Sequence, residues 1–573
     1  MNRKSKWFVL RHTACLIVVS SVLGWLSSSL SAQEATEGKV LYGEEVIVTG
    51  SRLHRLDAYS LSPISTVTAE DLSASGNITL ENFLQDLPST LGGADYGSSV
   101  NNGNPGLATV QLRGLGPNRT LVLLNGRRLP SAGVDGFVDL NMIPTSIIER
   151  IEVLRDGAST AYGSDAIAGV INIITKREFQ GMQADFGYDV TGEGDGEQYN
   201  LSFVWGTTHE RGSTLLSAQY TKRADIWQGD RGFSECPYFE TGGMRLCGGS
   251  GTTTPAQIFP DVDDADSYIV DPATGLVRQY DSAQDAYNYA AASYLVTPQE
   301  VYSLFGAADY TLVEASPYGA ISAFVESGFT NRESNQLMAA VGTFWSPLVP
   351  TNHPNNPFGD TLCASNPDCT ISQDVYIARR LEESGGRGFI QDAQSWRFVL
   401  GLEGKFNNGW SWDISYNYAD WTDAQRETGK ALQPNIETML DPDACAADSG
   451  CPGIWNPFDQ GTLTGDLLGY GTVAVNTIER SRVRSLQVNL SGDLLDFWQL
   501  QGGPVLWALG YERRSESAES LPDGGAAIGA VYFTPGEETA GAYSVDEFYA
   551  ELSLPVLAGK PWAEALTLEG SVR

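Results

Sequence analysis

Six of the seven cysteines have a spacing that most directly suggests a chemistry, and the seventh, Cys15, lies in an N-terminal segment that we expect to be removed. The six lie as close neighbours, in the pairs Cys236 and Cys247, Cys363 and Cys369, and Cys445 and Cys451. Six thiols allow 15 pairings, but pairing each cysteine with its neighbour leaves no thiol over and suits an oxidising compartment. A zinc site would need tighter C-x2-C spacing and nearby histidines, of which the later sequence has three, His54, His209 and His353. We therefore predict three local disulfides in loops.

No group of residues in the sequence predicts catalysis. The sequence shows no Ser, His and Asp in the order of a catalytic triad, no metal-ligand cluster, and no Gly-rich phosphate loop followed by a helix. A balance of 70 acidic against 36 basic residues argues against nucleic acid as a partner. We attribute the acidity to the solubility of exposed loops rather than to a cationic ligand. The expectation is therefore a protein that is not an enzyme and needs no cofactor or metal.

The N-terminus predicts export. Basic residues from Arg3 to Arg11 precede an apolar run from about Ala14 to Leu26, and small residues follow near Ala32. This is the order of a secretory signal peptide. A membrane anchor is the alternative, but the run is shorter than the about 20 residues that cross a bilayer. We predict a signal peptide at residues 1–32, cleaved after Ala32, and a periplasmic tether at residues 33–55.

Residues 56–177 predict a mixed α+β domain. Thr68 before AEDL and Thr79 before LENFLQDL mark two helix starts, and Pro88 stops the second helix. The segments TVQLRG, TLVLLNGRRL, RIEVLRDG and GVINIITK have the composition of short strands and are separated by glycines.

Residues 178–573 predict a wall of long antiparallel strands. In MQADFGYDV the apolar side chains from Met182 to Tyr188 alternate with polar ones, which is typical of a strand with one apolar face. Ten more segments follow: QYNLSFVWGT, TLLSAQYTKRADIW, VYSLFGAADYTLVE, AISAFVESGFTNRES, SWRFVLGLEGKF, WSWDISYNYADWTDA, RSRVRSLQVNLSG, PVLWALGYERRSES, SVDEFYAELSLPV and ALTLEGSVR. Since no apolar run after the signal has the length of a membrane helix, we expect these strands to enter the membrane as a barrel.

The connections between these strands predict an orientation. Tight turns at HERG, SPYG and NNG alternate with long connections at about 228–298, 336–390 and 428–474, which hold all three cysteine pairs. Outer-membrane barrels have short periplasmic turns and long outer loops. A soluble β-sandwich is the alternative, but it would not require long loops on one side only.

Two parts of the sequence resemble the TonB-dependent outer-membrane receptors. The segment from Glu44 to Arg52, EEVIVTGSR, is similar to the family's TonB box, for which the resemblance implies Glu45, Val46, Ile47, Val48 and Thr49. A β-prone tether of this kind can add as a strand to a partner's sheet edge. The alternative is that it forms the first strand of the folded domain.

The stronger resemblance lies in residues 56–177, which look like the family's plug domain. Leu112-Arg113-Gly114 with TLVLLNGRRLP, and IERIEVLRDGAS with YGS and AIAGVINIIT, match the family's two plug motifs. The chain departs from the common pattern at Asp156-Gly157, where the family often has Gly-Pro. The resemblance implies an α+β plug inside a transmembrane antiparallel β-barrel.

The resemblance also implies functional residues. Arg113 and Arg155 fall where the family places plug arginines that pair with carboxylates of the barrel wall, for which Glu512 is a candidate; a salt bridge within the plug is the alternative. The outward plug loops, which offer stacking and hydrogen-bonding groups, are expected to contact solute. They contribute Asp95, Tyr96, Ser98, Asn101, Asn102, Asn104, Ser131, Asp135 and Phe137.

The expected function is TonB-dependent import of a scarce solute through the bacterial outer membrane. The resemblance implies as partners TonB with ExbB and ExbD, outer-membrane lipid, and a small organic or metal-chelate solute, in a monomeric barrel. A ferric siderophore, cobalamin and an oligosaccharide all remain possible substrates. The alternatives are a surface-binding barrel without transport and a non-functional truncated receptor. Receptors of this family have 22 strands, so with about eleven strands here we expect residues 178–573 to be the N-terminal part of an incomplete barrel.

Overall fold

The computed structural model describes residues 46–47, 51–55, 64–76, 79–91, 106–260, 266–314, 316, 319–366, 369–494, 499–532, 534, 536–561 and 563–573. The predicted signal peptide of residues 1–32 lies outside these residues. So do Glu45, Val48 and Thr49 of the predicted TonB box, and so do the predicted ligand contacts Asp95, Tyr96, Ser98, Asn101, Asn102 and Asn104.

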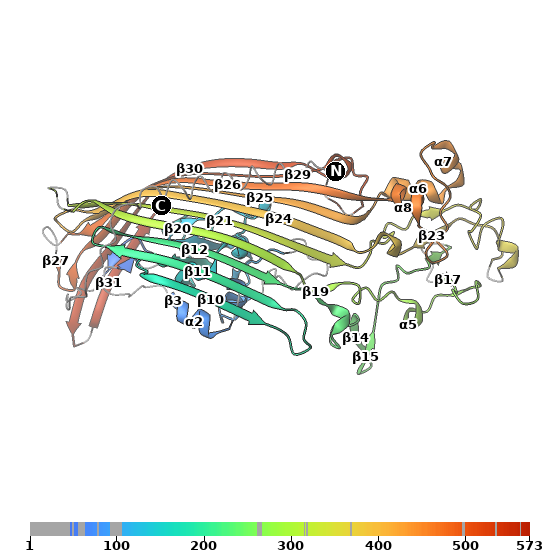
Figure 1. Cartoon of the computed structure of the whole chain (residues 1–573), viewed down its shortest axis with the longest axis horizontal. Coiled ribbons are helices and arrows are strands. Elements are labelled where there is room, and N and C mark those ends of the chain that lie inside the picture. The colour runs from blue at the N-terminus through green and yellow to red at the C-terminus, as the bar shows by residue number, and fades with distance from the viewer. Residues whose placement is uncertain are drawn as a thin grey trace. The chain divides into compact units, whose positions relative to one another are not determined.

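One antiparallel sheet of eleven strands forms the wall, and each strand pairs with the next long strand along the chain. Its strands, in order, are β10 (Gly181–Asp189), β11 (Gln198–His209), β12 (Gly212–Arg223), β20 (Gln299–Val313), β21 (Ala320–Met338), β24 (Arg387–Lys405), β25 (Ser411–Ala431), β26 (Thr472–Asp493), β29 (Leu506–Pro522), β30 (Thr539–Lys560) and β31 (Ala563–Val572). All eleven predicted strands are confirmed, and Figure 1 shows them side by side. The sheet is not closed, because β10 and β31 are its two edges.

Strand β24 shows why these sequences form a wall. Trp396 and Phe398 are exposed on one face, whereas Arg397 and Val399, which alternate with them, are buried. Successive side chains of a strand point to opposite faces, so a period of two gives one apolar outer face and one inner face. Several strands extend well beyond the about ten residues that cross a membrane, and β26 has 22 residues.

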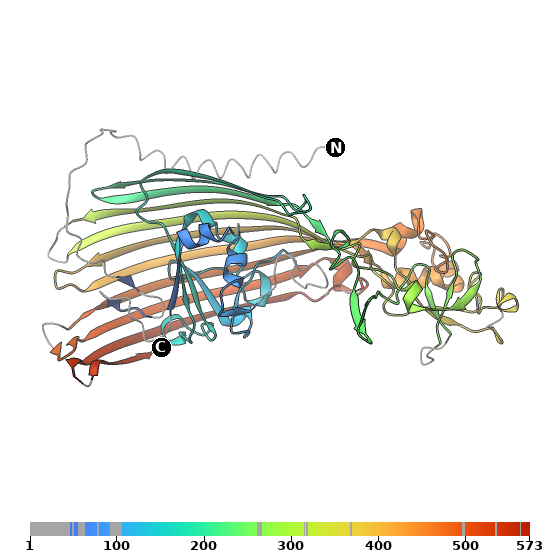
Figure 2. The same cartoon turned by 90° about the horizontal axis from the view of Figure 1, so that it is seen from below.

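The plug is a small α+β domain built on a five-stranded sheet. The strands are β3 (Ile64–Thr68), β8 (Ile148–Leu154), β9 (Gly169–Thr175), β6 (Thr120–Leu124) and β7 (Arg127–Arg128), in that order, and only β6 and β9 run parallel. Helices α2 (Ala69–Ala74) and α3 (Leu80–Gln85) share a buried core with this sheet. Figure 2 shows these plug elements against one face of the wall.

Local sequence explains several plug elements. Thr68 caps α2 through a capping box with Asp71, and Thr79 accepts a hydrogen bond from the amide of Asn82 at the start of α3. Both predicted helix starts are thereby confirmed. Asn125 and Gly126 both have positive φ, of 53° and 71°, as a tight type I′ turn between paired strands requires.

The long connections fold together at one end of the wall strands. Strands β16 (Gln257–Phe259), β17 (Tyr268–Val270), β18 (Val277–Gln279), β22 (Leu348–Val349) and β23 (Val375–Ala378) form one sheet. Helices α6 (Gln433–Leu440), α7 (Pro442–Ala447) and α8 (Gly465–Gly471) lie at the same end in Figure 1. The connections share a hydrophobic core that includes Ile258, Phe358, Ile377, Met439 and Trp455. We call this assembly the outer-loop domain.

Each cysteine of the connections is bonded to its sequence neighbour. The Cα atoms are 5.7 Å apart in the pair Cys236 and Cys247, 5.2 Å in Cys363 and Cys369, and 5.3 Å in Cys445 and Cys451. The structure therefore has the three local disulfides that the spacing predicts.

Within the described part of the chain, no helix combines the length and the apolar character needed to cross a membrane.

Candidate solute-binding site

The plug rests on the wall through buried charged groups. Arg397 of β24 and Glu326 of β21 form an ion pair of 2.7 Å, and both side chains are buried. Glu326 also accepts a hydrogen bond of 2.9 Å from the Asn125 side chain, and Arg397 donates one of 3.2 Å to the carbonyl of Leu124. The β6–β7 hairpin of the plug is thus held by a wall ion pair.

A second ion pair joins the plug directly to the wall. Arg332 of β21 lies 3.0 Å from Asp139, which begins the plug turn Leu140–Met142. The other carboxylate oxygen of Asp139 accepts hydrogen bonds from the amides of Ala108 and Asn141. Asp139 therefore links two plug segments, the one at Ala108 and its own turn, to the wall.

The predicted plug arginines are placed differently from the expectation. Arg155 is half-buried and donates to Ser65 of the plug, while Arg113 is exposed. Among the described residues neither contacts a wall carboxylate. Glu512, the suggested wall partner, pairs at 2.5 Å with Arg573 of the wall instead. The plug-to-wall ion pair that the structure does describe has the opposite sense, with the arginine on the wall and the carboxylate on the plug.

A cavity of about 1040 Å³ lies between the plug, the wall and the outer loops. The plug contributes Val134 and Asp135, from the turn Gly133–Asp135. The outer loops and adjoining strand ends contribute the rest, including Tyr289, Gln336, Phe344, Arg380, Arg387, Phe389, Glu427, Lys430, Thr477, Glu479, Ser520, Thr534 and Glu537. Aromatic rings, hydroxyl groups and charges of both signs around such a volume suit a polar organic solute.

The basic side chains of the cavity differ in how they are neutralised. Lys430 lies 2.5 Å from Glu427, so its charge is paired. Arg380 instead donates to the carbonyl of Ala340 and stacks on Tyr287 and Phe344. Burial, followed by the nearby positive charge of Arg387, lowers the pKa of Arg380 to about 10.

The described residues among the predicted ligand contacts have different surroundings. Asp135 lines the cavity, as expected of an outward plug loop. Phe137 packs in a hydrophobic cluster with Leu107 and with Trp421 of the wall, and Ser131 donates to the carbonyl of Gly133. The plug loop around Phe137 therefore packs the plug against the wall and also lines the cavity.

Sequence reasoning missed the contributions of the outer loops. Arg380, Phe344 and Tyr289 lie in long connections that carry no recognisable motif. The consecutive arginines 379 and 380 were a usable signal, because two adjacent like charges in a loop repel each other unless they have partners or a ligand.

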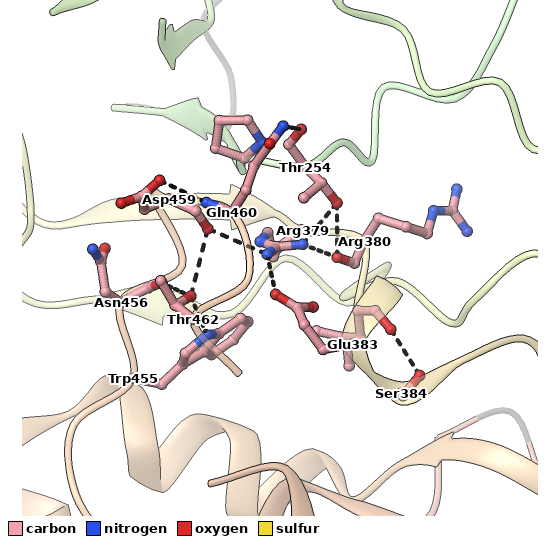
Figure 3. A network of polar contacts seen from close by, with 12 residues as sticks. Thr254, Arg379, Arg380, Glu383, Ser384, Trp455, Asn456, Asp459, Gln460 and Thr462 are labelled. Atoms are coloured by element: carbon pink, nitrogen blue, oxygen red, sulfur yellow. Dashed lines mark hydrogen bonds and ion pairs between the residues drawn. The ribbon is translucent and has the colours of Figure 1, made fainter. Parts of the chain in front are cut away.

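A network around Arg379 holds three of these connections together (Figure 3). Arg379 donates at 2.7 Å to Glu383, at 2.7 Å to Thr254 and at 3.2 Å to the carbonyl of Asp459. Thr254 belongs to the connection between β12 and β20, Arg379 and Glu383 to that between β21 and β24, and Asp459 to that between β25 and β26. One fully buried guanidinium thus fixes three loops around the cavity.

The segment at the predicted TonB box is followed by residues that contact strand β30 of the wall. Strand β1 (Val46–Ile47) pairs antiparallel with β2 (His54–Arg55). Between them, the Ser51 hydroxyl and the Arg52 amide donate to Glu551 of β30, and the Arg52 guanidinium lies over Tyr549 of the wall. Of the five predicted box residues, the structure describes Val46 and Ile47, and both lie in this hairpin.

Comparison with known protein families identifies the plug. Residues 58–170 match the family model of the TonB-dependent Receptor Plug Domain. This match covers both capped helices and four strands of the plug sheet, β3, β6, β7 and β8, and it ends at the second residue of β9; it does not cover the wall. TonB-dependent receptors are outer-membrane receptors and transporters and not enzymes.

Solved structures that resemble the chain share little sequence with it. A mutant ferric enterobactin receptor (PfeA) from Pseudomonas aeruginosa is 14% identical with a TM-score of 0.42, over 89% of this chain and 61% of its own. The siderophore receptor PirA from Acinetobacter baumannii is 15% identical with a TM-score of 0.45, over 86% and 54%. The ferric yersiniabactin uptake receptor FyuA from Yersinia pestis is 12% identical with a TM-score of 0.40, over 86% and 61%. This chain spans less than two thirds of the length of these receptors.

Proposed function

This chain carries the plug domain of a TonB-dependent receptor, and we propose that it serves the energised import of a scarce solute across the bacterial outer membrane into the periplasm. The observation that carries the proposal is the position of this plug. It packs on the inner face of an eleven-stranded wall and presents Asp135 to a cavity of about 1040 Å³ under the outer loops.

In the proposed mechanism, the solute binds in this cavity and the inner-membrane TonB, with ExbB and ExbD, captures residues 45–49. The captured segment adds as a strand to a sheet edge of TonB through its main-chain groups. Pulling on it acts first on the Ser51 and Arg52 contacts with Glu551, because these residues follow the segment directly. Displacement of the plug then opens a path along the wall.

The solute is a ferric siderophore, a cobalamin or an oligosaccharide in this proposal. A surface-binding barrel without transport is the competing function, which the folded outer-loop domain favours because it presents a shaped surface. Uptake in strains with and without TonB separates the two, since surface binding needs no energy coupling.

The test compares Val48→Pro with Val48→Ala in cells. Proline removes an N–H and fixes φ, so the segment can no longer pair main chain to main chain. Alanine keeps the N–H and leaves φ free, so Val48→Ala is the matched control. We expect Val48→Pro to abolish uptake of radiolabelled iron chelates, cobalamin or oligosaccharide without reducing surface binding. Equal uptake by the two variants, or uptake that persists without TonB, would contradict the proposal.

A further inference from the structure

Arg379 and Arg380 follow one another in the chain and serve different places. Figure 3 shows Arg379 turned into the network that joins the loops, with Arg380 pointing away from it. Arg380 lines the cavity, as does Arg387 at the start of β24. Because the Arg379 network fixes the backbone of this loop, the direction of Arg380 is fixed as well.

Arg380 and Arg387 line the same cavity, and two consecutive carbonyls hold them. Arg380 donates to the carbonyl of Ala340 at 2.8 Å, and Arg387 donates to the carbonyl of Ala339, also at 2.8 Å. Arg380 also donates through Nε to the carbonyl of Thr252 at 3.4 Å. Each guanidinium has five N–H donors, so these bonds leave other donors available. The rings of Tyr287 and Phe344, with centroids 4.8 Å and 5.1 Å from the Arg380 guanidinium carbon, further restrict its position.

Among the described residues, no carboxylate forms an ion pair with either arginine. Glu427 is engaged by Lys430, and Glu382, whose charge acts on Arg380 from a distance, is exposed. The cavity also has an acidic side. A side-chain atom added at Gly133 would meet the carboxylate of Glu479, so Glu479 lies against the plug turn that carries Asp135. Glu537 is exposed at the cavity.

Two neighbouring cations in a partly desolvated cavity repel each other unless an anion lies between them. Planar guanidinium groups bind carboxylate, catecholate and phosphate oxygens with paired hydrogen bonds. We propose that Arg380 and Arg387 form an anion subsite and that the solute of this cavity is anionic, presenting at least two oxygen atoms to this pair. The inference rests on the proposed function, because it takes the cavity as the solute site, and it selects an anionic chelate over a neutral oligosaccharide.

The test uses two iron chelates of different net charge as probes, a trianionic ferric tris-catecholate and a neutral ferric trihydroxamate. Binding is measured by tryptophan fluorescence quenching with the 573-residue chain purified in detergent, at low and high salt. We expect the trianion to bind at least about tenfold more tightly than the neutral chelate, and its affinity to fall as salt rises.

The variants are Arg387→Gln, the double variant Arg380→Gln with Arg387→Gln, and the charge-preserving Arg387→Lys. The control is Arg245→Gln, which removes an exposed arginine that stacks on Tyr238. Arg387→Gln should weaken trianion binding at least about tenfold and leave neutral-chelate binding unchanged. Arg387→Lys should keep most of the affinity, and Arg245→Gln should change neither.

We expect Arg387→Gln to fold, because Arg387 is half-buried and Arg380 keeps its contacts with the Ala340 carbonyl and the two aromatic rings. Equal affinity for the two chelates, no binding of either, or equal losses for both in Arg387→Gln would overturn the inference. TonB-dependent uptake of the neutral chelate alone would overturn it and leave the proposed function standing. Trianion binding that depends on Arg387, without TonB-dependent uptake, would support the anion subsite and contradict the proposed function.

Discussion

Arg332 of the wall and Asp139 of the plug face each other at 3.0 Å with both side chains fully buried. Removing one partner of such a pair leaves the other as an uncompensated buried charge. Asp139→Leu should therefore lower the free energy of unfolding by about 3–5 kcal/mol. Thermal unfolding in detergent measures this.

The matched control for this pair is Glu519→Leu, which breaks the exposed pair between Glu519 and Arg480. Exposed pairs contribute little to stability, so this variant should unfold close to wild type. The double variant Asp139→Leu with Arg332→Leu should recover part of the loss, because the Arg332 guanidinium is no longer left unpaired, while the amides of Ala108 and Asn141 still lack their acceptor. An Asp139→Leu variant as stable as the control would show that the pair does not hold the plug.

Arg379→Met should loosen the outer-loop domain. The change removes the partner of buried Glu383 and the donors to Thr254 and the Asp459 carbonyl at once. We expect faster cleavage of residues 250–460 by protease added outside the cell. Arg278→Met is the control, because the described partners of Arg278 are neighbours in its own loop, Asp271, Asp285 and the carbonyl of Gln279. Equal cleavage of the two variants would refute the role of Arg379.

The outer-loop domain should lose stability in acid through His353. The backbone amide of Asn355 donates to Nδ1 of His353, so the proton is on Nε2, which donates to the carbonyl of Trp455. Burial lowers the pKa of His353 from its ordinary value of 6.5. A group with a lowered folded pKa binds fewer protons when folded, so stability falls as pH drops below about 6.5.

This pH dependence can be measured by protease sensitivity of the outer loops at pH 7.5 and at pH 5. The wild type should be cleaved faster at the lower pH, and His353→Gln should reduce the difference between the two. His209→Gln, which changes an exposed histidine of β11, should keep the wild-type difference. A His353→Gln variant with the full wild-type response would assign the acid effect to other groups.

The three disulfides should be local in the oxidised protein. Peptide mapping by mass spectrometry should find Cys236 with Cys247, Cys363 with Cys369, and Cys445 with Cys451. Cys369 and Cys451 also pack against the shared loop core. Reduction should therefore make the outer loops more sensitive to protease. A link between any other two cysteines, or free thiols at these positions, would contradict the prediction.

Glu551 should hold the start of the plug in place. Its carboxylate accepts from the Ser51 hydroxyl and the Arg52 amide, at 2.8 Å and 3.0 Å. Glu551→Ala should speed hydrogen exchange of the Arg52 amide at least about tenfold, since a charged hydrogen-bond acceptor is lost. Asp546→Asn on the same strand, which bonds Tyr511 on the exposed face, should leave that exchange rate unchanged. Equal rates in the two variants would remove Glu551 from the contact.

Local patterns in the sequence were sufficient for the secondary structure. A period of two marks a strand with one apolar face, and Thr68 and Thr79 can each bond an amide three residues on, so all eleven wall strands and both helix starts were predictable. Close cysteine neighbours predicted their own pairing, because short loops bring them together. The plug motifs were by themselves enough to indicate the plug domain, because they are long and contiguous in the chain.

Long-range contacts were decided only by the tertiary structure. Arg332 and Asp139 are far apart in sequence, and the register of plug against wall brings them together. Arg113 and Arg155 occupy the expected motif positions, but within the described part of the chain neither meets a wall carboxylate. The outer loops show no periodicity, because their core is assembled from four separate connections. A cavity between such segments depends on the direction of each side chain after folding, and no spacing along one chain segment specifies that direction.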